Sequence, residues 1–138
     1  MKKKPKGWKF WVGWVLTALP SFALLMSGVM KLIRHPEVLK NMVERFGYPD
    51  STVVAVGVVE VLCMVLYVAP PTSVLGAVLV TGYLGGAVAT HVRAGDGAGD
   101  VITPILLGVM AWAALFLRDE RLRSLLPLRK PAATPPGA

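Results

Sequence analysis

The chain has 138 residues, a length that fits one domain. Apolar residues make up 54% of it and its formal net charge is +7, whereas soluble proteins are roughly 45–50% apolar. A nucleic-acid-binding domain would carry its basic residues as a stripe on a folded surface. Here they gather at both ends of the chain and between apolar blocks, which argues against a nucleic-acid partner and favours a membrane protein.

The apolar residues fall in four blocks, 10–30, 52–69, 72–90 and 101–117. A bilayer core about 30 Å thick is crossed by a helix of about 20 apolar residues. A soluble bundle would show a polar face on every helix, and these blocks show almost none. We therefore predict an all-α integral membrane four-helix bundle in the lipid bilayer, with helices at about 10–31, 52–69, 72–92 and 101–117.

The first predicted helix follows a basic tail, residues 1–9. Phe10, Trp11 and Trp14 at its start form the aromatic anchor expected at a membrane interface. The uncharged block is longer than the h-region of a signal peptide, typically about 7–15 residues, so we expect a retained helix. Lys31 ends this helix, and taken alone it is more typical of a lysine that extends to the membrane interface.

Residues 36–46 have the pattern of a short amphipathic helix in the first loop. Its apolar face consists of Val38, Leu39, Met42, Val43 and Phe46, and its other face is charged or polar. Gly47 ends the pattern. We predict that this helix lies along the membrane surface or caps the bundle.

The second predicted helix contains Glu60 near its middle, where insertion of an acidic side chain costs about 2.5–3.5 kcal/mol. One interpretation is a protonated carboxyl that bonds a neighbouring helix for packing specificity. The other is a group that binds a proton or a ligand. The only cysteine, Cys63, lies on the same helix and is expected to be an apolar packing residue.

The third predicted helix carries two stripes of residues spaced four apart. Tyr83 and His91 lie on one stripe, with Thr90 beside His91. Gly82, Gly86 and Thr90 form the other, a small-residue pattern that indicates close helix contact, within the chain or in a homodimer. Taken alone, His91 is more typical of an interfacial hydrogen-bonding residue than of a ligand. No metal site is predicted, because two histidines without a carboxylate cluster make a poor ligand set.

Helices one and three run in the same direction, so Lys31 and His91 are expected at the same, outer level. Glu60 lies about 12 Å deeper at 1.5 Å per helical residue. We hypothesise a polar pocket that opens outward, with Glu60 at its floor and with Lys31, Tyr83, Thr90 and His91 around it. A Glu60 side chain that faces lipid would contradict this hypothesis.

The charged residues outside the blocks predict an orientation. Ten of the fifteen basic residues lie in the two tails, 1–9 and 118–138, and five lie in the loops after helices one and three. The positive-inside rule therefore places both termini in the cytoplasm of a plasma or inner membrane protein. Residues 93–100 are predicted to form a flexible outer turn, and residues 119–138 a basic and then Pro/Ala-rich tail.

Three motifs resemble, in order, those of DoxX-like membrane proteins. The run from Gly28 to Leu32 resembles the glycine-x-x-lysine-leucine end of their first helix. The run from Gly57 to Leu62 is similar to their glycine-x-x-glutamate-x-leucine helix, and residues 82–91 resemble their third helix, which ends in histidine. The resemblance covers roughly residues 10–117. It implies a four-helix membrane bundle whose polar set includes Lys31, Glu60 and His91, and it specifies no cofactor.

The resemblance favours one function over two others. Names in the family refer to quinone-linked sulfur oxidation and oxidative-stress partners, so we expect a non-catalytic subunit, or a protein that binds a quinone-like or lipid-like molecule, with a membrane or redox partner. A proton-coupled exporter is the first alternative, although small multidrug transporters carry their glutamate in helix one. A membrane isomerase or oxidoreductase, with Glu60 and His91 as acid and base, is the second.

Overall fold

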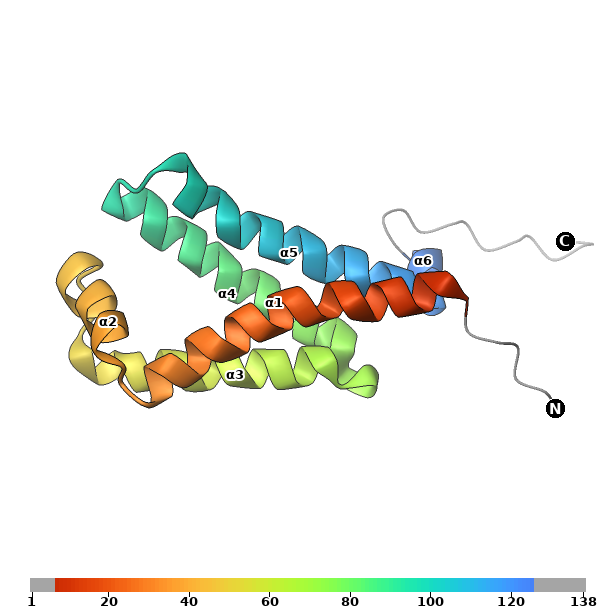
Figure 1. Cartoon of the computed structure of the whole chain (residues 1–138), viewed down its shortest axis with the longest axis horizontal. Coiled ribbons are helices and arrows are strands. Elements are labelled where there is room, and N and C mark those ends of the chain that lie inside the picture. The colour runs from red at the N-terminus through yellow and green to blue at the C-terminus, as the bar shows by residue number, and fades with distance from the viewer. Residues whose placement is uncertain (1–6, 126–138) are drawn as a thin grey trace, which may run out of the picture.

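The computed structural model of the chain describes residues 7–125. Four long helices, α1 (Trp8–Leu32), α3 (Val53–Val68), α4 (Ser73–Ala94) and α5 (Ala98–Arg118), make up most of it. Each of the four, taken with the short turns that lead into α3 and α4, is long and apolar enough to cross a membrane. α1 and α4 each pack against both α3 and α5, which closes the bundle (Figure 1). The prediction of an all-α membrane four-helix bundle is confirmed.

A short segment covers one end of the bundle. It consists of α2 (Pro36–Leu39), the π-helical turn η1 (Lys40–Arg45) and the residues through Tyr48, and we call residues 36–48 the cap. The turn η2 (Asp50–Thr52) then leads into α3. Met42 is buried and the other residues of the predicted apolar face are half-buried, so the predicted amphipathic sidedness is confirmed. The π-helical turn, in which Phe46 N–H donates to the carbonyl of Asn41 at 2.9 Å, was not predicted.

The other connections are short. η3 (Pro70–Thr72) joins α3 to α4, and only residues 95–97 separate α4 from α5. The turn predicted over 93–100 is present but shorter, because Gly95 adopts a left-handed conformation with φ of 73° that ends α4, and α5 begins at Ala98. A short helix, α6 (Glu120–Leu125), lies where a tail was predicted, and its Leu122 is buried. The remainder of that tail lies outside the described residues.

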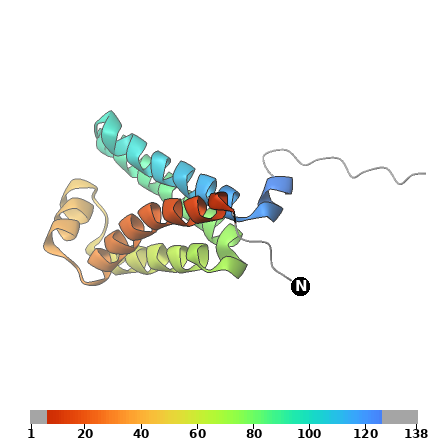
Figure 2. The ribbon, with the colours of Figure 1, turned by 45° about the vertical axis from the view of Figure 1, so that its right-hand side comes forward.

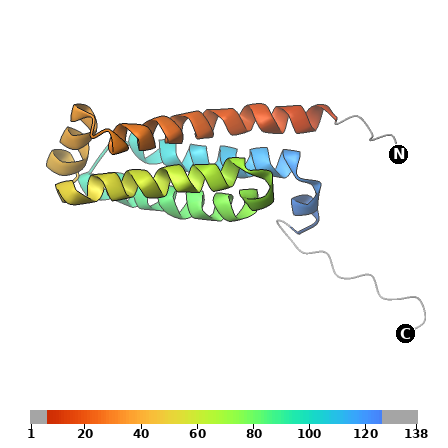
Figure 3. The same ribbon diagram turned by 90° about the horizontal axis from the view of Figure 1, so that it is seen from below.

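The packed core lies toward the end of the bundle that is opposite the cap. Met64, Tyr67, Val80 and Leu115 are almost fully buried there, and the Tyr67 hydroxyl donates to the carbonyl of Ala111 at 2.8 Å. α1 begins and α5 ends at this same end (Figure 3). From it the α1–α3 pair and the α4–α5 pair spread apart from each other toward the cap (Figure 2). Large apolar side chains are exposed along all four helices, as expected for surfaces in contact with lipid.

Candidate ligand-binding cavity

Two glycines set the contact between α1 and α3. A Cβ atom on Gly57 would lie 2.8 Å from the Cβ of Lys31 and 3.0 Å from the carbonyl oxygen of Gly28. A Cβ atom on Gly28 would lie 2.7 Å from a methyl group of Val61. Any larger residue would therefore separate the helices. Because Lys31 follows Gly28 by three residues and Glu60 follows Gly57 by three, this crossing brings the two charged side chains together.

Lys31 and Glu60 form a buried ion pair. Lys31 Nζ donates to Glu60 Oε2 at 2.8 Å and to Ser27 Oγ at 2.6 Å, and Ser27 Oγ donates to the same Oε2 at 3.3 Å. The side chains of Lys31 and Glu60 are 11% and 2% exposed. The interpretation of Lys31 as a lysine that extends to the interface is wrong, because its ammonium group turns back toward Glu60 and offsets the cost of burying that carboxylate.

The second carboxylate oxygen of Glu60, Oε1, differs from Oε2 in its hydrogen bonding. Glu60 Oε1 is buried and has no hydrogen-bond partner in the described part of the chain. Tyr83 is a neighbouring donor that interacts with the carboxylate, but its hydroxyl does not meet the geometry of a hydrogen bond to Oε1. Buried polar atoms are rarely left unpaired in proteins, so this oxygen marks a place where a further donor would be stabilised.

A cavity of about 720 Å³ lies under the cap, with walls from all four long helices and from the cap itself. The five residues predicted for the polar pocket, Lys31, Glu60, Tyr83, Thr90 and His91, all line it. Leu24 and Leu84, which belong to the packed core, line it as well.

Gly82 and Gly86 also line this cavity. A Cβ atom on either residue would meet nothing within 4 Å. The small-residue stripe of α4 therefore makes no close helix contact within the chain, contrary to one of the two predictions for it, and it leaves room for the cavity instead. Gly85, on another face of α4, lines a separate apolar hollow of about 660 Å³ between α4 and α5.

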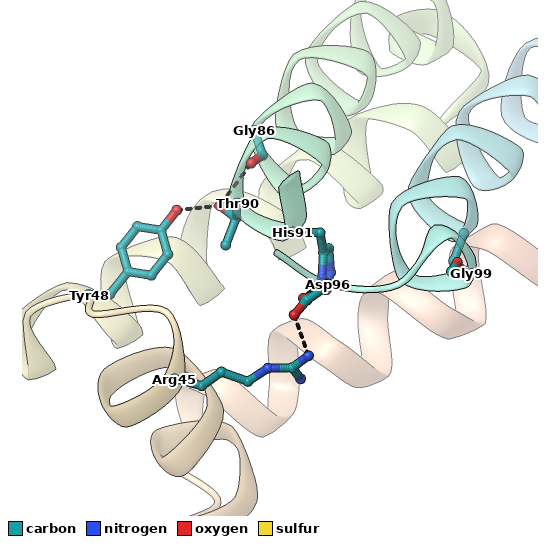
Figure 4. A network of polar contacts seen from close by, with 8 residues as sticks. Arg45, Tyr48, Gly86, Thr90, His91, Asp96 and Gly99 are labelled. Atoms are coloured by element: carbon teal, nitrogen blue, oxygen red, sulfur yellow. Dashed lines mark hydrogen bonds and ion pairs between the residues drawn. The ribbon is translucent and has the colours of Figure 1, made fainter. Parts of the chain in front are cut away.

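Polar contacts hold the cap on the end of α4 (Figure 4). Arg45 Nη2 donates to Asp96 Oδ1 at 2.5 Å, and His91 Nδ1 lies 2.6 Å from Asp96 Oδ2. Thr90 donates its only hydroxyl hydrogen to the carbonyl of Gly86 at 2.9 Å. The Tyr48 hydroxyl is therefore the donor in the 2.6 Å bond that joins it to Thr90. These contacts fix the cap over the cavity.

Asp96 is the centre of this network. Its side chain is 5% exposed, and the hydrogen bond to His91, with the guanidinium of Arg45, lowers the pKa of its carboxyl below the usual range. The ring of Phe46 packs edge-on against His91, with 5.3 Å between centroids. His91 thus hydrogen-bonds Asp96 and also lines the cavity.

Sequence reasoning missed Asp96, Arg45 and Tyr48 as parts of this site. The glycines around Asp96 suggested flexibility, although Gly95 is also the residue type that ends a helix in the left-handed conformation. That signal would have predicted a three-residue turn with Asp96 close to His91. No local signal pairs Arg45 with a residue so far along the chain.

Comparison with protein-family models matches residues 15–114 to the DoxX-like family. The chain belongs to the DoxX-like family. The matched region of this DoxX-like protein contains the whole cap and every residue that lines the cavity. No curated protein and no solved structure matches the chain.

The arrangement limits the chemistry of this DoxX-like protein. Glu60 bonds Lys31 and Ser27, whereas His91 bonds Asp96, and no hydrogen bond joins Glu60 to His91. The two side chains of the isomerase hypothesis therefore belong to separate hydrogen-bond networks that border the same cavity. Within residues 7–125 no group of three or more histidine, cysteine or acidic side chains could hold a metal ion.

Proposed function

We propose that this DoxX-like protein binds a small, largely apolar molecule in the cavity under the cap, and that it acts as a non-catalytic binding protein or membrane subunit. The cavity volume of about 720 Å³ falls in the range of small-molecule pockets, about 300–1,000 Å³. Its walls combine many apolar side chains with a few polar groups, as such pockets usually do. A quinone-like or lipid-like ligand and a redox or stress-response partner follow from the names used in the family.

The observation that carries this proposal is the position of the Lys31–Glu60 pair. A buried ion pair is often no more stable than apolar residues of the same volume, so packing alone gives little reason to keep one in a membrane helix. Here the pair borders a cavity, and one carboxylate oxygen has no partner. Both features suit a group that contacts a ligand.

Native mass spectrometry of protein extracted gently from its own membrane tests the proposal. Gly86→Leu places a side chain in the cavity without a clash at Cβ and is expected to abolish a bound small molecule that the wild type retains. Gly85→Leu is the matched control, because it is adjacent, equally free at Cβ and directed to the outer hollow, and it should retain the molecule.

Two results would count against the proposal. Equal amounts of the molecule on wild type and Gly86→Leu would place its binding elsewhere on the surface. A co-purifying protein on every form, with no small molecule on any, would make the chain a structural subunit and Glu60 a packing residue.

A further inference from the structure

We infer that the ligand of this cavity is a neutral, apolar molecule whose polar end, such as a hydroxyl group, donates a hydrogen bond to Oε1 of Glu60. This inference rests on the proposed function and specifies the chemistry that the same cavity recognises.

The two oxygens of the Glu60 carboxylate are unequally used. Oε2 accepts hydrogen bonds from both Lys31 and Ser27, while Oε1 accepts none although the whole residue is only 1% exposed. An ionised carboxylate is purely an acceptor with room for about four hydrogen bonds. A donor that reaches Oε1 would remove the cost of leaving this buried atom unpaired.

Several donors in the cavity wall are engaged with protein groups other than Oε1. The Thr90 hydroxyl donates to the Gly86 carbonyl and the Tyr48 hydroxyl donates to Thr90. Two of the three N–H groups of Lys31 bond Ser27 and Oε2. The Tyr83 hydroxyl interacts with the Glu60 carboxylate, but not with the geometry of a hydrogen bond to Oε1. Oε1 thus has room for a donor, and a ligand in the cavity can supply it.

The ion pair also selects the charge of the ligand. A cationic group at Oε1 would lie close to the Lys31 ammonium, and an anionic group would meet the carboxylate itself. Because Lys31 and Glu60 neutralise each other, a neutral donor avoids both repulsions. The remaining wall includes Leu24, Val56, Val59 and Leu107, which favours an apolar body behind the donor.

A competition experiment tests this inference on the whole protein in lipid nanodiscs. Equal amounts of 4-nonylphenol and its methyl ether are added, and native mass spectrometry measures the occupancy of each. The two probes share an apolar body, but only the phenol can donate. Gly86→Leu, whose added side chain obstructs the cavity, supplies the background for probe that is merely dissolved in the lipid. We expect phenol occupancy above this background to exceed ether occupancy at least about tenfold, because hydrogen bonds to charged groups are among the stronger ones.

The Glu60→Gln variant tests whether the preference for the phenol over the ether depends on Oε1. The donors Lys31 and Ser27 would hold the amide oxygen in the place of Oε2, so the amide NH₂ group would occupy the place of Oε1. The phenol-to-ether ratio should then fall to about one. A phenol preference that persists in Glu60→Gln would overturn the assignment to Oε1.

Wild-type protein compared with Gly86→Leu distinguishes this inference from the proposed function. Equal binding of phenol and ether above the Gly86→Leu background would overturn the donor inference and leave the binding function standing. Binding of neither probe above that background would overturn both.

Discussion

At the residue scale, Lys31 and Glu60 are buried together as an oppositely charged pair. Each alone would be a costly residue inside a membrane helix, and together they form a pair only 2.8 Å apart. Ser27 completes the hydrogen bonds on the side of the pair away from Oε1. The two residues therefore act together, and the stability of each single variant should be compared with that of the double variant.

Lys31→Met should lower the free energy of unfolding by about 3–5 kcal/mol, because it leaves the Glu60 carboxylate buried without its counter-charge. The double variant with Lys31→Met and Glu60→Leu should regain most of this loss. Thermal unfolding in one detergent, compared across the two single variants and the double variant, measures the coupling. A double variant less stable than Lys31→Met would contradict the ion pair as the reason.

At the element scale, Gly28 and Gly57 allow α1 and α3 to approach closely, whereas Gly82 and Gly86 of α4 line the cavity. Gly57→Ala should destabilise the fold by about 1–3 kcal/mol, because its Cβ would meet Lys31 Cβ at 2.8 Å and the Gly28 carbonyl oxygen at 3.0 Å. Gly86→Ala should be neutral or stabilise α4 by up to about 1 kcal/mol through helix propensity. Thermal unfolding of both variants checks the contrast, which equal losses would refute.

The cap is joined to the turn after α4 through the carboxylate of Asp96, which bonds Arg45. Since the folded pKa of Asp96 is below its usual value, its contacts contribute stability above about pH 3.9, the usual aspartate pKa, and lose it as the pH falls through the lower folded value. Hydrogen exchange of residues 40–48, corrected for intrinsic rates, should stay slow from pH 7 to pH 5. A marked increase within that range would contradict this role.

Asp96→Asn provides the matched control for that experiment. It keeps the size of the side chain but removes the charge that pairs with Arg45. Exchange over residues 40–48 should already be faster at pH 7 in this variant, and the loss of protection in acid should disappear. Unchanged exchange in Asp96→Asn would mean that the contacts of Tyr48 and Arg93 hold the cap without it.

At the scale of the whole molecule, the charge distribution predicts that the chain ends and the cap lie on opposite sides of the membrane. Single cysteines can test this once Cys63, the only native one, is replaced by alanine. Gly97→Cys, beside the cap, should react with a membrane-impermeant maleimide in intact cells, and Gly7→Cys only after permeabilisation. Neither position has an atom within 4 Å of an added Cβ. The reverse labelling pattern would invert the predicted orientation.

Some parts of the molecule could be predicted from the sequence and others could not. Apolar block length predicts the four spans, because a bilayer constrains helix length directly. The cost of a charge in a membrane also singles out Glu60. The pairing of Glu60 with Lys31 depends on how α1 and α3 meet, which no local pattern contains. Asp96 was missed for the same reason, since its partner Arg45 belongs to a distant part of the chain.

The bundle is packed around Tyr67 at one end, and toward the cap the α1–α3 pair spreads from the α4–α5 pair (Figures 1 and 2). The width of the cavity therefore depends on the angle between these two pairs, which could change without repacking the core around Tyr67. A change in this angle would alter how thick a ligand the cavity accepts. It would not move the polar end of the ligand, because the Gly28–Gly57 contact fixes the position of Glu60. We expect molecules of different thickness to be accepted as long as they end in the same chemical group.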